Sequence, residues 1–487
     1  MTRDDRPLPP RSANYADEIR DRAEARIEAE IAEHDARRNV GPGFIITGAA
    51  CLALGAYLVF ADTAGTGSRV DANVAITPDR AQPSITRDRT LDTARPALSP
   101  PATERPRTSG FALDLLEDVA RTAQASGVPR ATTERLLAAA GTPAEDVGRL
   151  AQEQPEFTRT AGDYLTQRVT QERIDAGRRK LVENAALLTQ LERRYGIDRH
   201  LLVAIWGIES NYGTNVGDRP VIRSLLSLAA TDQRRRSYWR DELTAALSLV
   251  GNGDVAPDRA LGSWAGALGP MQIMPSSVQR YATDFDGDGR RDVVSSLPDA
   301  LATAANQLKS SGWTEGRIWA REVKLPPNFD YALSGPQSAR SVAAWQMLGV
   351  RPATGLIPLD DEPTWQIVLP AGAAGPAFLA SSNFGVLLKY NRSTAYAIAV
   401  GHLADRLAGG SPMSAAWPPD DVALSMNETS ELQRLLAAAG FDPGPIDGIV
   451  GQYTRDALRN YQKARALVPD AHPTIAVLRQ LRTERRN

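Results

Sequence analysis

The sequence predicts a mainly α-helical protein of the α+β class, in which a small β subdomain is inserted into a helical domain. A transmembrane helix near the N-terminus and a compact three-helix module at the C-terminus are predicted in addition. Three observations support this architecture: helical spacing of apolar residues from residue 111 onward, short apolar runs between prolines after residue 323, and a helix–turn–helix pattern after residue 429. With 487 residues, the chain has room for about two to four folded units.

The N-terminal region contains one candidate membrane segment. Residues 1–43 form a charged tail, and residues 44–61 are uncharged and just long enough to cross a bilayer. Because Arg37 and Arg38 precede this segment and a mostly neutral stretch follows Asp62, the positive-inside rule places the tail in the cytoplasm. We expect a single-pass signal anchor in the inner membrane, with the folded domains in the periplasm. A cleaved signal peptide is disfavoured because its charged n-region would be about forty residues long.

The next segment and the overall composition narrow the functional classes. Residues 62–110 are rich in Pro, Thr, Ser, Ala and Arg, so they bury too little apolar surface to fold and are predicted to be a disordered tether. The formal net charge of −2 argues against nucleic acid as a partner. Cys51 is the only cysteine, which excludes a disulfide framework, and it lacks the preceding large aliphatic residue that favours lipidation. The four histidines are scattered without metal-ligand spacing.

The most informative stretch, DRHLLVAIWGIESNYG, runs from Asp198 to Gly213. Asp198 is a suitable N-cap and Gly213 a suitable stop, and the residues between them predict a buried helix that is apolar on nearly every side. Glu209 lies in this apolar run near the C-terminal end of the helix. Loss of hydration and the negative end of the helix dipole both disfavour the charged carboxylate, so we expect Glu209 to hold its proton as a general acid does. The alternative is a structural glutamate bound by backbone amides or an arginine.

A second informative stretch, GSWAGALGPMQIMPSS, covers residues 262–277. Its glycines at positions 262, 266 and 269 permit close backbone approach, and Gln272 places an amide in an otherwise apolar segment. Alone, this pattern is also compatible with a glycine-rich turn that packs on a helix. Its combination with ESNYG about fifty residues upstream is harder to explain by packing.

In this order, ESNYG, GSWAGALGPMQIMPSS and the later YNRSTAYA resemble the motifs of the lytic murein transglycosylase B family, in the lysozyme superfamily. The resemblance covers residues 111–410. It implies a lysozyme-like catalytic domain that cleaves the MurNAc–GlcNAc β-1,4 bond of peptidoglycan without water, leaving a 1,6-anhydro-muramyl end. By position in the motifs, Glu209 resembles the sole catalytic acid/base. The residues predicted to contact the substrate are Tyr212, Ser263, Gln272, Tyr390, Asn391 and Tyr396, with Tyr212 and Tyr390 as candidates for stacking on sugar faces unless they belong to the core.

A single carboxyl group is compatible with this chemistry. Glycosidases commonly use two carboxylates, but the three motifs contain only one. One acid suffices when the substrate's own 2-acetamido group stabilises the anomeric carbon and the C6 hydroxyl then attacks it. Glu209 would first protonate the leaving oxygen and then accept the proton of the C6 hydroxyl, and no cofactor is required. The alternatives are a muramidase that hydrolyses the same bond and a catalytically inactive wall-binding scaffold.

The sequence that follows contains a candidate calcium loop. Asp284, Asp286 and Asp288 match the first half of an EF-hand-like loop, but Ser295 occupies the twelfth position, where a bidentate glutamate is standard. A longer loop that closes on Asp299 is therefore expected, and the family that the chain resembles is known for such a loop. The alternative is a solvated Asp–Gly turn. The predicted ligands of a structural Ca²⁺ are Asp284, Asp286, Asp288, Arg290 and Asp299.

Residues from about 323 to 388 are predicted to form the inserted β subdomain. The runs interpreted as strands are REVKL (321–325), SVAAW (341–345), TWQIVLP (364–370), Phe378–Leu379 and the run at 384–388. Helix is expected to resume at residues 395–408. The Ser-, Pro- and Asp-rich residues 411–428 are interpreted as a linker.

Residues 429–485 resemble the peptidoglycan-binding module that is often attached to cell-wall hydrolases. Such a module binds without catalysis and raises the local concentration of substrate. Asp447 is at least as compatible with a turn as with a ligand contact. Peptidoglycan strands and the inner membrane are the predicted partners, and cell-wall or division-machinery proteins are further candidates. The predicted core of the module consists of Leu432, Leu435, Leu436, Ala457, Leu458, Tyr461 and Leu478.

Overall fold

The computed structural model describes residues 111–151, 159–357 and 364–486. The predicted charged tail, membrane segment (44–61) and tether (62–110) lie outside these residues. Among the helices of the described ranges, none is both long enough and apolar enough to cross a bilayer.

The described residues are mainly helical, as the sequence predicts. Two small antiparallel sheets interrupt the helices. The strands are β1 (Arg219–Pro220), β2 (Leu261–Gly262), β3 (Ala320–Lys324), β4 (Arg351–Pro352), β5 (Gln366–Val368) and β6 (Ala377–Ala380). The α-helices are α2 (Leu113–Ala125), α3 (Arg130–Ala139), α4 (Val147–Leu150), α6 (Ala161–Arg168), α7 (Gln171–Glu183), α8 (Ala185–Tyr195), α9 (Arg199–Ser210), α10 (Val221–Thr231), α11 (Arg236–Gly251), α12 (Pro275–Tyr281), α13 (Leu297–Ser310), α14 (Val342–Met347), α15 (Ser382–Tyr390), α16 (Thr394–Leu407), α17 (Met426–Ala438), α18 (Gln452–Ala464) and α19 (Ile475–Arg486).

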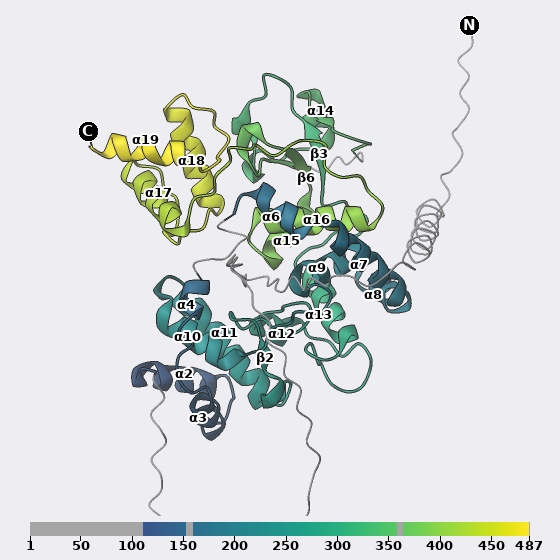
Figure 1. The fold of residues 1–487 in the computed structure, drawn as a ribbon, viewed down its shortest axis with the longest axis vertical. Coiled ribbons are helices and arrows are strands. Elements are labelled where there is room, and N and C mark those ends of the chain that lie inside the picture. The colour runs from purple at the N-terminus through teal and green to yellow at the C-terminus, as the bar shows by residue number, and fades with distance from the viewer. Residues whose placement is uncertain (1–110, 152–158, 358–363, 487) are drawn as a thin grey trace, which may run out of the picture.

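Helix α9 occupies the centre of residues 111–410, the predicted catalytic region. Figure 1 shows α2, α3 and α10–α13 in one half of the molecule and the larger sheet with α15 and α16 in the other, with α9 between them. Every residue of α9 except His200 is buried, so the helix is surrounded by other elements, in particular α16, α7 and α13. The Asp198 side chain accepts the His200 N–H at 2.7 Å, which confirms the predicted N-cap.

The larger sheet has the strand order β4-β3-β6-β5, and each neighbouring pair is antiparallel. Its register pairs Ala320 with Ala380 and Val323 with Ala377. All four residues of β6 are buried, because this strand is central and is covered on both faces. The sheet has its own core, with Trp345 and Trp365 as its largest fully buried side chains.

Two of the predicted strands are helices. The run SVAAW falls in α14, whose N-cap Ser341 accepts the Ala344 N–H, and the run at 384–388 falls in α15, capped by Ser381. Helix α15 packs against α13 and α16, so it belongs to the helical part, and the sheet begins three residues before the predicted boundary at 323. Short apolar runs fit a strand and a buried helix equally well by periodicity, and the serine caps decide for helix here.

The C-terminal module is a three-helix bundle, and all seven predicted core residues lie in its hydrophobic cluster. Its first helix begins at Met426 with a capping box between Ser425 and Glu428, so the predicted boundary at 429 lies inside the helix. The expected linker 411–428 also packs on the catalytic region. Trp417 lies against Gly162, and Glu322 accepts hydrogen bonds from the Ser414 hydroxyl and the Ala415 N–H.

Candidate active site

Helix α9 ends in a sharp turn directly after Glu209. The helix stops at Ser210, with Asn211 and Tyr212 both in the left-handed region at φ values of 50° and 59°, so the chain turns before the predicted stop at Gly213. The Ser210 hydroxyl donates to the Pro270 carbonyl at 2.6 Å and accepts the Gly213 N–H at 2.8 Å. This hydroxyl therefore stabilises the turn and attaches the end of α9 to the glycine-rich segment.

The carboxyl group of Glu209 is contacted by the hydroxyl of Tyr396 on α16. Tyr396 donates to Glu209 Oε1 at 2.5 Å, and both side chains are completely buried. Burial and the neighbouring charge of Glu209 raise the pKa of Tyr396 well above its ordinary value, so the phenol remains a proton donor. The Tyr396 hydroxyl therefore fixes the position of the carboxyl group.

Tyr390 connects this pair to the glycine-rich segment. Its ring stacks on that of Tyr396 with an interplanar angle of 5° and a centroid distance of 6.5 Å. Its hydroxyl donates to the Met271 carbonyl at 2.8 Å. Burial raises the pKa of Tyr390 well above its ordinary value, and the charge of Glu209 adds to the shift, so this phenol also keeps its proton. The three motifs of the sequence thus meet through a continuous set of contacts from Glu209 to Met271.

Gln272 follows in a tight turn in which its own φ is 47°. Its amide nitrogen donates to the carbonyls of Val216 and Gly269 at 3.0 and 2.9 Å. Its amide oxygen is buried and accepts no hydrogen bond from the described residues. Gly269, at φ 67°, has no room for a Cβ, which would overlap the Val293 carbonyl. The turn therefore contains one buried acceptor without a donor among the described residues.

The other predicted substrate residues have structural contacts. Ser263 is buried, and its hydroxyl accepts the Ala267 N–H at 3.0 Å inside the glycine-rich turn. Asn391 follows α15 and accepts the Ser393 N–H at 3.0 Å, ahead of α16. A sugar contact of either side chain stays a prediction.

Of the two roles considered for Tyr212, stacking on a sugar or packing in the core, the structure favours the core. Its ring is buried at 6% exposure, meets Trp206 edge-on and lies against Gly177 and Gly207. Its hydroxyl donates to the Arg173 carbonyl at 2.8 Å, which attaches the turn after α9 to α7. Tyr212 therefore belongs to the core and has no face available to a sugar.

Sequence reasoning missed two supporting side chains. One is Ser210 in the ESNYG motif. Its position at a helix end could have indicated that its hydroxyl bonds the backbone of the following turn. Glu242 on α11 is the other buried glutamate of the described residues. Its two carboxylate oxygens accept the Ser276 N–H at 2.9 Å and the Ser276 hydroxyl at 2.7 Å, so it holds the start of α12. Burial raises the pKa of Glu242 above its ordinary value.

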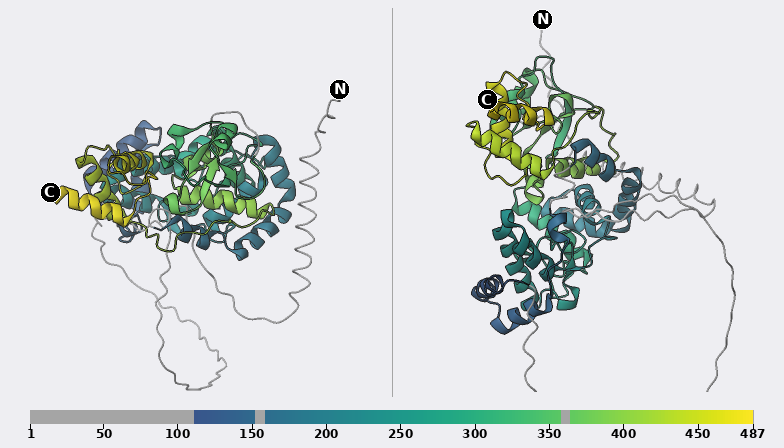
Figure 2. Two further views of the ribbon diagram at one scale, coloured as in Figure 1. Left: turned by 90° about the horizontal axis from the view of Figure 1, so that it is seen from above. Right: turned by 60° about the vertical axis from the view of Figure 1, so that its left-hand side comes forward.

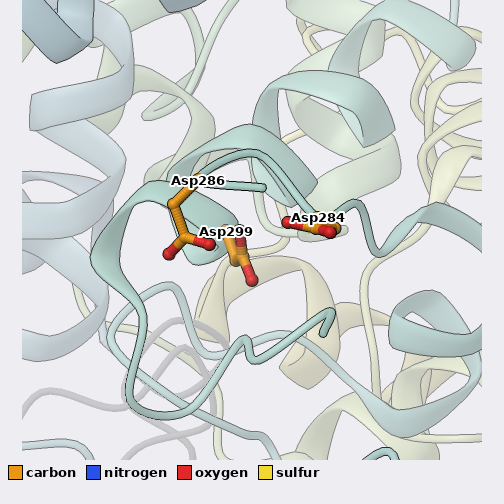
Figure 3. Close-up of side chains that lie close together, drawn as sticks. All are labelled: Asp284, Asp286 and Asp299. Carbon is orange, nitrogen blue, oxygen red and sulfur yellow. The ribbon is translucent and has the colours of Figure 1, made fainter. Parts of the chain in front are cut away.

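The candidate calcium loop brings three carboxylates together. Figure 3 shows Asp284 and Asp286 in the loop and Asp299 from the first turn of α13, each with an oxygen within 4.8 Å of the others. The Asp288 carboxylate is outside this group and accepts the N–H of Arg290, so its predicted role as a side-chain ligand is not supported. Burial raises the pKa of Asp299, although the N–H groups of Phe285 and Asp292 oppose the shift.

Comparison with known families gives these contacts a context. Residues 112–405 match the family described as Transglycosylase SLT domain. The chain belongs to this family. Residues 425–481 match a putative peptidoglycan binding domain, so the transglycosylase SLT domain is followed by the module that the sequence predicts.

Three relatives of the transglycosylase SLT domain are informative. The chain is 31% identical over 220 residues to the membrane-bound lytic murein transglycosylase B of Escherichia coli (strain K12), a match that covers 44% of this chain and 58% of that protein's length. SltB3 from Pseudomonas aeruginosa, in complex with NAG-anhNAM-pentapeptide, is 42% identical with a TM-score of 0.69, covering 77% of this chain and all of SltB3 (100%). The E. coli lytic transglycosylase Slt35 in complex with calcium is 25% identical with a TM-score of 0.54, covering 64% of this chain and 98% of Slt35.

Proposed function

We propose that this protein is a peptidoglycan lytic transglycosylase that cleaves the MurNAc–GlcNAc β-1,4 bond and leaves a 1,6-anhydro-muramyl end. The observation that carries the proposal is the buried carboxyl group of Glu209, held by the Tyr396 hydroxyl at the end of α9. Membership of the transglycosylase SLT family and the relatives that act on murein support the same reaction.

Glu209 serves as both acid and base in this proposal. It protonates the leaving oxygen first and then, as a carboxylate, accepts the proton of the substrate's C6 hydroxyl. Both oxygens of Glu242, the other buried glutamate among the described residues, are bound by Ser276, so this group is committed to structure. In this proposal the substrate's acetamido group takes the place of a second carboxylate. The buried amide oxygen of Gln272 is suited to accept a hydrogen bond from the N–H of that acetamido group.

Analysis of the soluble products tests the reaction. Wild-type protein digesting intact sacculi is expected to release anhydro-muropeptides, and Glu209→Gln is expected to release none above background. Products heavier by one water molecule would assign the muramidase reaction instead. Equal release by Glu209→Gln and wild type would remove Glu209 from catalysis, and no release by wild type would favour a wall-binding scaffold.

We also propose a membrane-anchored, periplasmic location, with residues 44–61 as the anchor. The uncharged sequence of this segment and the membrane-bound relative support it. Full-length protein is expected in the membrane fraction, whereas a chain starting at residue 111 is expected in the soluble fraction. A full-length chain that is released by a high-salt wash would contradict the anchor.

The acidic loop is proposed to hold a structural Ca²⁺. Its donors are hard carboxylate oxygens, as calcium prefers, and a cation would offset the burial that raises the pKa of Asp299. Asp284, Asp286 and Asp299 would hold the ion, together with backbone oxygens of the loop. Calcium is expected to raise the melting temperature of the wild type and not that of Asp286→Asn. An unchanged wild-type melting temperature after chelation would contradict the proposal.

A further inference from the structure

Two adjoining cavities lie between the C-terminal module and the catalytic region. One has a volume of about 100 Å³ and the other about 130 Å³. Arg392, Thr394, Val450 and Arg455 line both cavities. Arg392 lies in the loop before α16 and Thr394 begins that helix, whereas Val450 and Arg455 belong to the module. The space is therefore formed only where the two units meet.

The lining of these cavities carries an excess of positive charge. Arg159 lines the first cavity and Arg459 the second, in addition to the two shared arginines, and the charge of Arg459 is paired with Asp456 at 2.7 Å. The carboxylates that line them are Asp421 and Asp470, and both are already bound. His472 Nε2 lies 2.8 Å from Asp421, and Asp470 accepts the Ala373 N–H at 3.0 Å and the Gln462 amide at 2.8 Å.

The two shared guanidinium groups are not bonded directly to a carboxylate of the described residues, although the negative charge of Asp470 acts on Arg455 and opposes the lowering of its pKa. Within the described residues, neither the Arg392 nor the Arg455 side chain makes a hydrogen bond or an ion pair. Arg455 is partly buried, and burial together with the positive charge of Arg459 lowers its pKa to about 10. Guanidinium groups in such a position are favourable sites for bidentate binding of a carboxylate.

We propose that these cavities bind carboxylate groups of a peptidoglycan stem peptide, with Arg392 and Arg455 as the direct contacts. The inference rests on the proposed function, because it assumes that the glycan of the same strand lies at Glu209. The repeating acetamido sugars carry no charge once the lactyl group is amide-linked to its peptide, so the stem peptides supply the carboxylates. Cavities of about 100 Å³ accommodate the end of a peptide better than a run of sugar rings.

The location of Arg392 connects this site to the acid. Arg392 lies two residues after Tyr390 and four before Tyr396, the two side chains that hold Glu209 and the glycine-rich turn. A carboxylate bound by Arg392 is therefore attached to the short segment that also positions the acid. The opposite wall comes from the module that matches a peptidoglycan-binding family. The site thus selects strands that still carry their peptides.

Binding measurements on the full chain with Glu209→Gln, which prevents turnover, test the proposal. The probes are NAG-NAM-pentapeptide, the same disaccharide without peptide, and inorganic phosphate. Arg392→Gln and Arg455→Gln are each expected to weaken pentapeptide binding about tenfold and to leave binding of the peptide-free disaccharide unchanged. Arg479→Gln, an exposed arginine of α19, is the matched control and is expected to change neither.

Three results would overturn the proposal. They are unchanged pentapeptide binding by both variants, equal loss for the peptide-bearing and peptide-free ligands, and tighter binding of phosphate than of the pentapeptide. Because Arg392 is exposed, Arg392→Gln is expected to fold even if Arg455→Gln does not. In that case the binding result for Arg392→Gln alone tests the carboxylate site.

Activity separates this inference from the proposed function. Sacculi are compared before and after an amidase has removed their stem peptides. In one outcome, the wild type releases anhydro products, and Arg392→Gln cleaves the intact and the peptide-free sacculi at the wild-type rate. The proposed peptide site is then wrong, whereas the proposed transglycosylase reaction is supported. If the wild type releases no anhydro product from either, the proposed function fails, and the binding experiment still decides the carboxylate site.

Discussion

At the scale of single residues, the contact between Tyr396 and Glu209 has the greatest consequence. The phenol donates to a buried carboxyl oxygen, and such a hydrogen bond contributes about 0.5–1.5 kcal/mol when the carboxyl is neutral and about 1.5–3 kcal/mol when it is charged. A single buried hydroxyl of this kind fixes the rotamer of the acid without adding a charge. The site therefore requires the hydroxyl group of Tyr396 and not its aromatic ring alone.

Tyr396→Phe is expected to lower the rate of glycan cleavage about tenfold or more while the protein stays folded, because the ring is kept and only the hydroxyl is lost. Initial rates on purified sacculi measure the effect, and circular dichroism verifies folding. Tyr331→Phe, in the sheet region, is the control and is expected to cut at the wild-type rate. An unchanged rate for Tyr396→Phe would show that the hydroxyl does not position the acid.

Asp405 on α16 is expected to make stability depend on pH. Burial raises its pKa from 3.8 to about 6, although the Trp319 indole N–H donates to it at 3.1 Å. Because the folded-state pKa lies above the unfolded value, the stabilising contribution of the protonated group is present below about pH 4 and is lost as the pH rises through about 6.

Asp405→Asn removes this titration and keeps an oxygen for the indole. Its free energy of unfolding is expected to equal that of the wild type near pH 4 and to exceed it by about 2 kcal/mol at neutral pH. Denaturant unfolding at both pH values measures the difference, with the exposed Asp258→Asn as control. A difference that is the same at both pH values would contradict the raised pKa.

At the scale of elements, the glycines inside α9 and α15 have different surroundings. A Cβ on Gly207 would lie 2.7 Å from the Tyr212 ring, which is itself fixed by its bond to Arg173. A Cβ on Gly385 would meet nothing within 4 Å. The same substitution is therefore expected to have opposite effects in the two helices.

Gly207→Ala is expected to lower the free energy of unfolding by about 1–2 kcal/mol, since the overlap outweighs the gain in helix propensity. Gly385→Ala is expected to raise it by up to about 1 kcal/mol, because only the propensity term acts. Thermal or denaturant unfolding of both variants provides the comparison. A stabilised Gly207→Ala would show that Tyr212 can move aside.

The elements also show which features could be read from the sequence. The buried helix with its Asp198 cap and the core of the module follow from periodicity and capping, and the structure confirms them. The runs SVAAW and 384–388 are helices and not the predicted strands, because a run of five mostly apolar residues has no decisive period. The pairing of Glu209 with Tyr396 depends on packing between segments that are 187 residues apart, and no local pattern encodes which hydroxyl meets which carboxyl.

At the scale of the whole molecule, the C-terminal module docks on the catalytic region. Figure 2 shows the module beside the sheet region, where Arg459 donates to Ser334 at 3.3 Å and Asp470 accepts the Ala373 N–H at 3.0 Å. Few polar contacts join the two units, so the loss of one is expected to be noticeable. The docked arrangement is also what creates the two arginine-lined cavities.

Asp470→Asn places an amide N–H₂ among groups that already donate, so the docking of the module is expected to weaken. The expected results are a larger radius of gyration by small-angle scattering and faster proteolysis of residues 411–425. Asp442→Asn, in an exposed turn of the module, is the control. Scattering curves identical to those of the wild type would show that the docking does not depend on Asp470.

The separation between Glu209 and Tyr396 also has a consequence for biosynthesis. The acid emerges from the ribosome long before the phenol that holds it, because 187 residues lie between them. A nascent or prematurely terminated chain that ends before residue 396 contains the acid and the glycine-rich turn but not the group that orients the acid. If Glu209 and Tyr396 act as proposed, glycan cleavage therefore requires translation to have passed residue 396.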